Sequence, residues 1–95
     1  MSIDELTIRW EDENGVEATR EIDKVVLTRG MWVTIMFLYQ VLDKKTEEYG
    51  EPQARIVRYK KIKENYVAQS KFNISGKKQA MQIVEQLQRW YSPQE

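Results

Sequence analysis

The fold is decided by residues 31–43, which read MWVTIMFLYQVLD. From 31 to 41 every odd-numbered residue is apolar or aromatic, whereas the even-numbered residues include Thr34 and Gln40. Successive side chains of a strand point to opposite faces of a sheet, so this alternation predicts a strand with one fully apolar face. We expect this segment to be the central strand of the fold, with its odd-numbered side chains in the core.

The residues before this strand predict two more strands. Residues 6–11 alternate between apolar and polar side chains, which indicates a half-buried strand, and Asn14-Gly15 after them is typical of a hairpin turn. Residues 21–29 predict further strand, either continuous with the following one or separate from it. Gly30 then marks a bulge or a corner.

The register of the first hairpin depends on the length of its loop. A two-residue turn would place two pairs of like charges across the ladder, which is destabilising. A three-residue loop with Gly15 in the left-handed conformation leaves only Glu11 opposite Glu17 and pairs Trp10 with Ala18. We therefore predict the three-residue loop.

The C-terminal half predicts a second hairpin and a helix. Residues 44–52 are polar and typical of an exposed loop, and strands are predicted over residues 55–63 and 66–74 around a Glu64-Asn65 turn. Ser75 then caps a helix over residues 76–91, whose apolar side chains recur at helical spacing: Ala80, Ile83, Val84, Leu87 and Trp90.

These elements predict one α+β domain over residues 1–95. Its expected architecture is a single antiparallel sheet of four to five strands followed by one C-terminal amphipathic helix packed on one face of the sheet. Within it we assign Tyr59, Phe72 and Trp90 to the core.

The composition excludes many functions. The chain has no cysteine and no histidine, so it lacks a thiol nucleophile, a thiolate metal site and the commonest general base. We predict no enzyme activity, no cofactor, no metal site and no small-molecule substrate; carboxylates such as Glu47 and Glu48 are a weak alternative. Residues 1–5 lack the apolar core of a signal peptide and residues 31–42 are too short to span a bilayer, so a soluble, cytoplasmic protein without a membrane partner is expected.

Charge is sorted along the sequence, although the net charge is zero. Residues 1–27 hold eight acids and three bases, a net charge of −5, and the remainder holds twelve bases and seven acids, a net charge of +5. Residues 53–78 carry eight bases and a single acid. Such asymmetry is typical of a polyanion-binding surface, and the alternative is that the two segments neutralise each other within the fold.

The second hairpin is expected to place several of these bases on one face. A two-residue Glu64-Asn65 turn sets Arg58 opposite Lys71 and Lys60 opposite Gln69, with Asn73 at the end of the same face. Like charges opposite each other destabilise a sheet by up to about 1 kcal/mol, so a bound anion would explain the Arg58–Lys71 pair. The alternative is that both side chains splay into solvent.

Further residues are predicted to join this cationic face. Trp32, on the mixed face of the central strand, is expected to stack on a base; the alternative for Trp32 is a second small core or a dimer interface. Arg55 and Tyr66 are weaker contacts, because the register turns them to the other face. Lys77 and Lys78 lie at the helix start, where a nearby phosphate would offset their repulsion by the helix dipole.

The order of elements resembles a known group of proteins. A hydrophobic strand, a basic hairpin and the stretch Lys71-Phe72-Asn73-Ile74-Ser75, which leads directly into an amphipathic helix, look like the sheet-plus-helix single-stranded DNA binders of the Whirly and positive-cofactor-four type. The resemblance covers about two-thirds of the chain, and the Lys-Gly-Lys signature of Whirly proteins is absent. It implies DNA binding on the sheet through Arg58, Lys60 and Lys71, and assembly into oligomers.

The sequence therefore predicts a protein that binds single-stranded DNA or RNA on a basic and aromatic sheet face and forms a homodimer. The alternative is a homodimeric protein–protein interaction module that does not bind nucleic acid. The candidate contacts are Trp32, Arg55, Arg58, Lys60, Tyr66, Gln69, Lys71, Asn73, Lys77 and Lys78.

Overall fold

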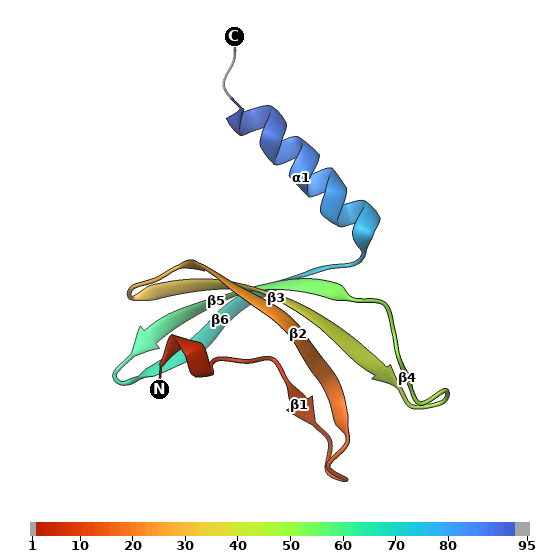
Figure 1. Ribbon diagram of the computed structural model, residues 1–95. Coiled ribbons are helices and arrows are strands. Elements are labelled where there is room, and N and C mark those ends of the chain that lie inside the picture. Colours follow the sequence, from red (N-terminus) through yellow and green to blue (C-terminus); the bar gives the residue numbers. More distant parts are fainter. Residues whose placement is uncertain (1, 93–95) are drawn as a thin grey trace.

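The computed structural model describes residues 2–92 and shows a curled antiparallel sheet with one C-terminal helix (Figure 1). Its elements, in chain order, are the 3-10 helix η1 (Ile3–Glu5), the strands β1 (Trp10–Glu11), β2 (Glu17–Thr28), β3 (Trp32–Asp43), β4 (Glu48–Tyr49), β5 (Gln53–Ile62) and β6 (Asn65–Ile74), and the helix α1 (Lys77–Tyr91).

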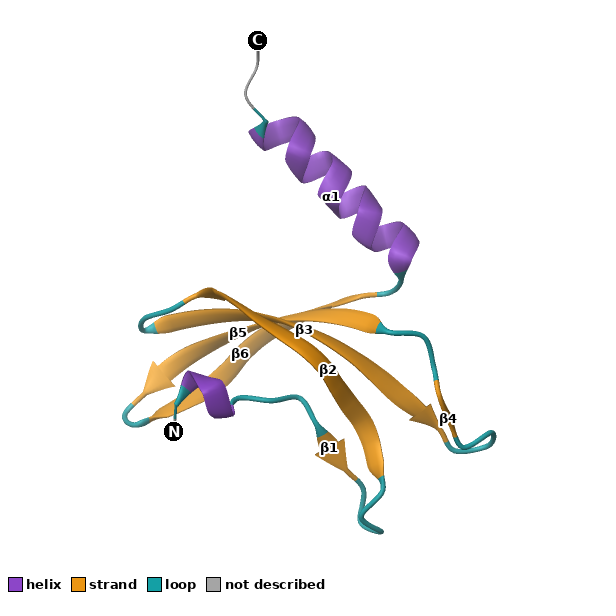
Figure 2. Cartoon of the chain, viewed as in Figure 1, coloured by secondary structure: helices purple, strands orange, loops and turns teal. Residues whose placement is uncertain are grey.

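The strands are ordered β1-β2-β3-β5-β6, and β4 pairs with the end of β3. The predicted α+β class, antiparallel sheet and central position of β3 are confirmed (Figure 2). The sheet has six strands, more than the four to five expected, because the segment predicted as an exposed loop contains β4. This short strand pairs Tyr49 with Leu42.

The core lies on one side of the sheet, which we call the inner face. Val33, Ile35 and Phe37 are completely buried there and Tyr39 is 2% exposed, so the prediction for the odd-numbered residues of β3 is confirmed between 33 and 39. Leu6 packs against this cluster from the N-terminal segment. The predicted strand over residues 6–11 is wrong except for β1, because Leu6 covers the sheet instead of pairing with it.

A lysine ties the N-terminal segment to the inner face. The Lys24 ammonium donates hydrogen bonds to the backbone carbonyls of Ile3 (2.8 Å), Asp4 (3.1 Å) and Leu6 (2.6 Å). Lys24 is the registered neighbour of Phe37, so its stem lies over the apolar cluster. The end of η1 is thereby capped by a cation that belongs to the sheet.

The first hairpin has the predicted loop. Asp12 and Val16 close a three-residue loop through a 2.8 Å backbone hydrogen bond, and Gly15 is left-handed with φ 79°. Glu11 faces Glu17 as expected, and Arg9 forms ion pairs with both carboxylates, which removes the repulsion.

A β-bulge nevertheless alters the register of this hairpin by one residue. It lies between Trp10 and Glu11, so Trp10 pairs with Thr19 and not with Ala18.

The second hairpin has a different register from the predicted one. Ile62 pairs with Asn65, so the turn is Lys63-Glu64, and Lys63 takes a left-handed φ of 58°. A bulge at Gln69 then moves the ladder back by one residue, from Tyr59 opposite Ala68 to Arg58 opposite Ser70.

The bulge exchanges the faces of β6 from Ser70 onward, whereas the altered turn changes partners without changing faces. Val57 pairs with Lys71, and Ile56 pairs with Phe72. Phe72 is therefore 51% exposed on the outer face, and its assignment to the core is wrong, whereas Tyr59 is buried as expected.

The helix α1 is not packed on the sheet. It leaves the end of β6 on the side opposite the N-terminal segment, and none of its residues is buried (Figure 1). Trp90 is 71% exposed, so the prediction that it belongs to the core is wrong. The reason is that residues 3–8 already cover the face that the helix was expected to cover. The N-cap is Gly76, while the preceding residue, Ser75, bonds the Gln79 side chain through its amide and its hydroxyl.

Candidate nucleic-acid interface

The outer face, opposite the core, is built from rows of registered neighbours that cross the strands. In the row nearest the β2–β3 turn, Trp32 lies beside Lys60, which lies beside Val67. The next row contains Thr34, Arg58 and Ser70. We call these two rows the cationic half of the outer face.

Trp32 is the centre of the cationic half. The guanidinium carbon of Arg58 lies 4.1 Å from the centre of the Trp32 ring, and the Lys60 ammonium lies 5.4 Å from it. Contacts of this kind are worth about 0.5–1 kcal/mol at exposed sites, so they hold the two cations in place over the ring. Arg58 takes part in none of the ion pairs that join described residues, and its charge remains available to an anion.

Two further rows of the outer face are mostly apolar. One consists of Val25, Met36, Ile56 and Phe72, each the registered neighbour of the next. The other consists of Asp23, Leu38, Ala54 and Ile74. We call these rows the apolar half; polarity on the outer face therefore changes along the strands from cationic to apolar.

The predicted cationic strip is divided between the two faces. Lys71 is the registered neighbour of Val57 on the inner face, whereas Arg58 faces Ser70 on the outer face. The expected pair of Arg58 and Lys71 is therefore wrong, and the repulsion inferred from it does not exist. The physical cause is the register: each one-residue slip moves side chains to the opposite face.

Several other predicted contacts lie on the inner face, at the two opposite ends of the β5–β6 ladder. The Arg55 Nε donates to Asn73 Oδ1 at 2.6 Å, and the guanidinium lies 4.6 Å from the Tyr39 ring. Tyr66 packs against the core, with the Lys61 ammonium 6.0 Å from its ring. These groups are used in contacts within the chain.

The remaining candidates lie apart from Trp32. Gln69 is at the β-bulge and donates to the carbonyl of Val67 at 3.2 Å. Lys77 lines a hollow beside Leu38 in the apolar half, and Lys78 follows it in the first turn of α1. The structure thus brings Trp32, Arg58 and Lys60 together and does not bring the other candidates to them.

Sequence reasoning missed two parts of this surface. Thr34, which it placed on this face, flanks Arg58 on one side, but Ser70 on the other side could not be placed without the bulge. A second cation–aromatic pair, Arg20 over Tyr49 at 3.8 Å, depends on the unpredicted strand β4. The Tyr49 hydroxyl donates to the Glu17 carbonyl at 2.7 Å, so this pair fastens β4 to β2.

Comparison with known proteins does not assign a function to this surface. Within residues 2–92, no three metal-ligating side chains are grouped so that they could hold an ion, and no helix has the length and apolarity needed to cross a membrane. No protein-family model, no curated protein and no solved structure matches the chain.

Proposed function

We propose that the protein binds single-stranded nucleic acid, DNA or RNA, on the cationic half of its outer face. The observation that carries this proposal is the placement of Arg58 and Lys60 over the partly exposed ring of Trp32 on the central strand. Arg58 would move from the indole to a phosphate, Lys60 would neutralise another, and a base would stack on the indole in place of the guanidinium. The hydroxyls of Thr34 and Ser70 flank Arg58 and would donate hydrogen bonds to phosphate oxygens.

The zero net charge does not oppose this function, because phosphates respond to local charge within a Debye length of about 8–10 Å. The order of strand, basic hairpin and helix that resembles Whirly and positive-cofactor-four proteins favours the same function. In contrast to what that resemblance implies, the proposal assigns no contact to Lys71, which lies on the inner face.

The salt dependence of binding gives a quantitative test. Two phosphate contacts on a single strand predict a slope of about −1.4 in a plot of log K against log salt concentration. The affinity should then fall about sevenfold between 50 and 200 mM salt. Removal of the Trp32 ring should weaken binding by about 1–3 kcal/mol, the usual worth of one stacked base.

The experiment is fluorescence anisotropy with a labelled oligonucleotide at two salt concentrations. Lys60→Ala should weaken binding and lower the salt slope by about 0.7, whereas Lys71→Ala, a matched lysine on the opposite face, should leave both unchanged. Absence of binding by the wild-type chain at low salt would refute the proposal. Equal losses in the two variants would refute the assignment to the outer face.

The alternative function is a homodimeric interaction module without nucleic-acid binding. The observation that favours it is the exposure of apolar side chains on both the sheet and the helix, including Phe72 at 51% and Trp90 at 71%. Patches of this kind mark interaction surfaces on soluble proteins. A chain that self-associates and shows no binding in the anisotropy experiment would have this function alone.

A further inference from the structure

Two apolar surfaces of this chain are largely exposed. The first is the apolar half of the outer face, where Val25 is 47% and Phe72 51% exposed. A hollow in this half is lined by Val25, Met36, Leu38 and Ala54. A second hollow, between the sheet and the first turn of α1, shares Leu38 and Ala54 with the first. Together they form a groove across the outer face.

The second surface is the apolar stripe of α1, formed by Ala80, Ile83, Val84, Leu87 and Trp90. Leu87 is 45% and Trp90 71% exposed. The opposite side of the helix is polar and carries an ion pair between Glu85 and Arg89 at 3.2 Å. A helix of 15 residues is marginally stable alone in water, and its stability normally comes from burial of such a stripe.

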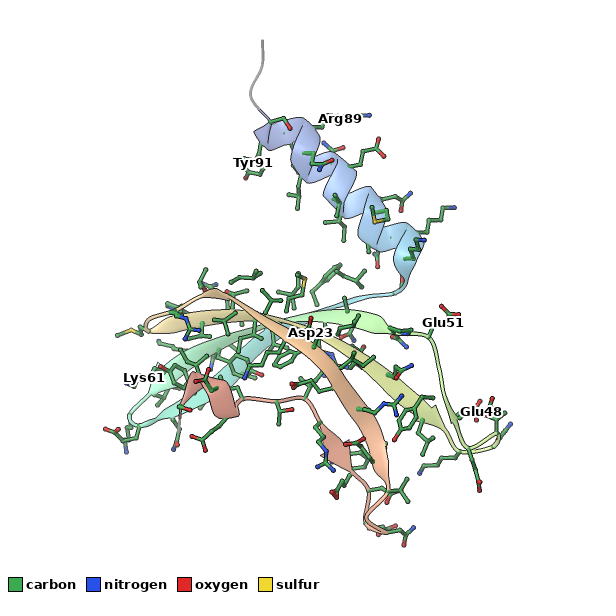
Figure 3. All side chains as sticks on the ribbon, in the orientation of Figure 1. Asp23, Glu48, Glu51, Lys61, Arg89 and Tyr91 are labelled. Atoms are coloured by element: carbon green, nitrogen blue, oxygen red, sulfur yellow. The ribbon has the colours of Figure 1, made fainter. Side chains whose placement is uncertain are left out.

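We propose that α1 of one copy lays its apolar stripe in the outer-face groove of a second copy, and that the second copy does the same in return. Each chain carries both a helix stripe and a groove. A two-fold dimer therefore buries both stripes and both grooves at once and leaves none of the four surfaces exposed. The helix points away from its own groove, with Arg89 and Tyr91 at the end remote from the sheet (Figure 3). It is therefore presented to another molecule.

Charge is compatible with the same pairing. The hollows of the groove are lined by one acid, Asp23, and by Lys77, and the Lys24 ammonium beside the first hollow is held on the inner face by a backbone carbonyl. The first turn of α1 contains Lys77 and Lys78 and no acid, and the last turn carries Arg89. Asp23 of one copy can therefore pair with a base on the helix of the other copy.

The exposed aromatic side chains supply about a third of the area of a stable dimer interface. A Phe or Trp side chain buries about 150–250 Å² when it is covered. At the exposures of Phe72 (51%) and Trp90 (71%), burial of both residues in both copies would remove roughly 400–600 Å² from water. A stable interface buries about 1,200–2,000 Å² in total, and Val25, Val84 and Leu87 add to the aromatic share in each copy.

The first test is the mass of the full chain in solution, measured by sedimentation velocity across a concentration series. The wild type should be a dimer. Leu87→Lys places a charge in the stripe and should give a monomer, whereas Gln82→Lys places the same charge on the polar side of the helix and should remain a dimer. A monomeric wild type, or equal behaviour of the two variants, would overturn the proposal. Circular dichroism would show that both variants keep the fold.

The second test identifies the surfaces in contact and exploits the absence of cysteine. Phe72→Cys and Leu87→Cys chains would be mixed and treated with a short bismaleimide crosslinker. A crosslinked species that contains one chain of each kind is expected. Its absence from a dimeric mixture would show that another surface mediates association and would overturn the proposal. Crosslinking within a monomeric double variant would show that α1 closes on its own sheet, which would also overturn it.

The inference does not rest on nucleic-acid binding, because it uses the apolar half of the outer face and not the residues around Trp32. Its two tests are performed without nucleic acid, so their failure would leave the proposed function unaffected. Failure of the anisotropy experiment would equally leave the dimer unaffected.

Discussion

Lys24→Met should destabilise the fold by releasing the N-terminal segment from the inner face. The ammonium of Lys24 donates to three backbone carbonyls, those of Ile3, Asp4 and Leu6, at 2.6–3.1 Å. Methionine retains a flexible apolar stem over Phe37 and removes only the charged donor. The experiment therefore isolates the hydrogen bonds from the packing.

The magnitude follows from the surroundings of each carbonyl. A hydrogen bond to a charged group contributes about 1.5–3 kcal/mol. The bond to Asp4 is exposed and contributes least, and the bonds to Ile3 and Leu6 are partly buried and share one donor. We expect a loss of about 2–3 kcal/mol, a large part of the 5–15 kcal/mol that stabilises a typical domain. For a domain of this size, Tm should fall by roughly 8–24 °C.

Thermal unfolding followed by circular dichroism measures this loss. The matched control is Lys45→Met in the loop after β3, where the backbone amide and not the ammonium makes the hydrogen bond to Asp43. The control should change stability by less than about 0.5 kcal/mol. If Lys24→Met were as stable as the control, the ammonium would not hold the N-terminal segment, and the argument from its three carbonyls would be refuted.

Three further predictions concern the core, a titratable group and a turn. Phe37→Ala should cost about 3–5 kcal/mol in urea unfolding, because this side chain is completely buried; a loss below 1 kcal/mol would contradict that burial. Burial raises the pKa of the Tyr59 hydroxyl, so this group ionises at lower pH in the unfolded chain than in the folded one, and the stability of the wild type should fall above about pH 10. Tyr59→Phe removes the hydroxyl and should lose less stability between about pH 9 and 11, as denaturation at a series of pH values would show. Gly15→Ala should cost about 1 kcal/mol of unfolding free energy because φ is 79°, whereas Gly50→Ala, where an added Cβ meets only an ordinary contact, should show no such loss.

Elements with a strong local pattern were predictable from the sequence. The period-two alternation of residues 31–41 identified β3 and most of its buried side chains, because one face of a central strand must be apolar. The loop of the first hairpin was identified from the charges that would face each other across the ladder and from Gly15, which can adopt the left-handed conformation that a three-residue loop requires. Both predictions depended on contacts between residues close in sequence.

The candidate site was only partly predictable, since it depends on a register with no strong local signal. Trp32, Arg58 and Lys60 were correctly placed on one face, because they lie on β3 and β5, whose alternation is clear. The turn at Lys63-Glu64 uses a left-handed lysine where a glycine or asparagine is usual, and the bulge near Gln69 has no sequence signature. The turn alone would have left Lys71 on the face of Arg58, and the bulge moved it to the other face.

The position of α1 shows a different limit. The apolar stripe of a helix indicates that the helix is buried on one side, but it does not identify the surface that covers it. Here the inner face of the sheet is already covered by residues 3–8. The sequence that predicted an amphipathic helix was therefore right about the helix and wrong about its neighbour. A stripe without a surface of its own to cover, in a chain that also exposes an apolar groove, is the pattern expected when the missing layer comes from a second copy. Such a layer would cover the apolar rows of the outer face and leave Trp32 with its two cations open to solvent.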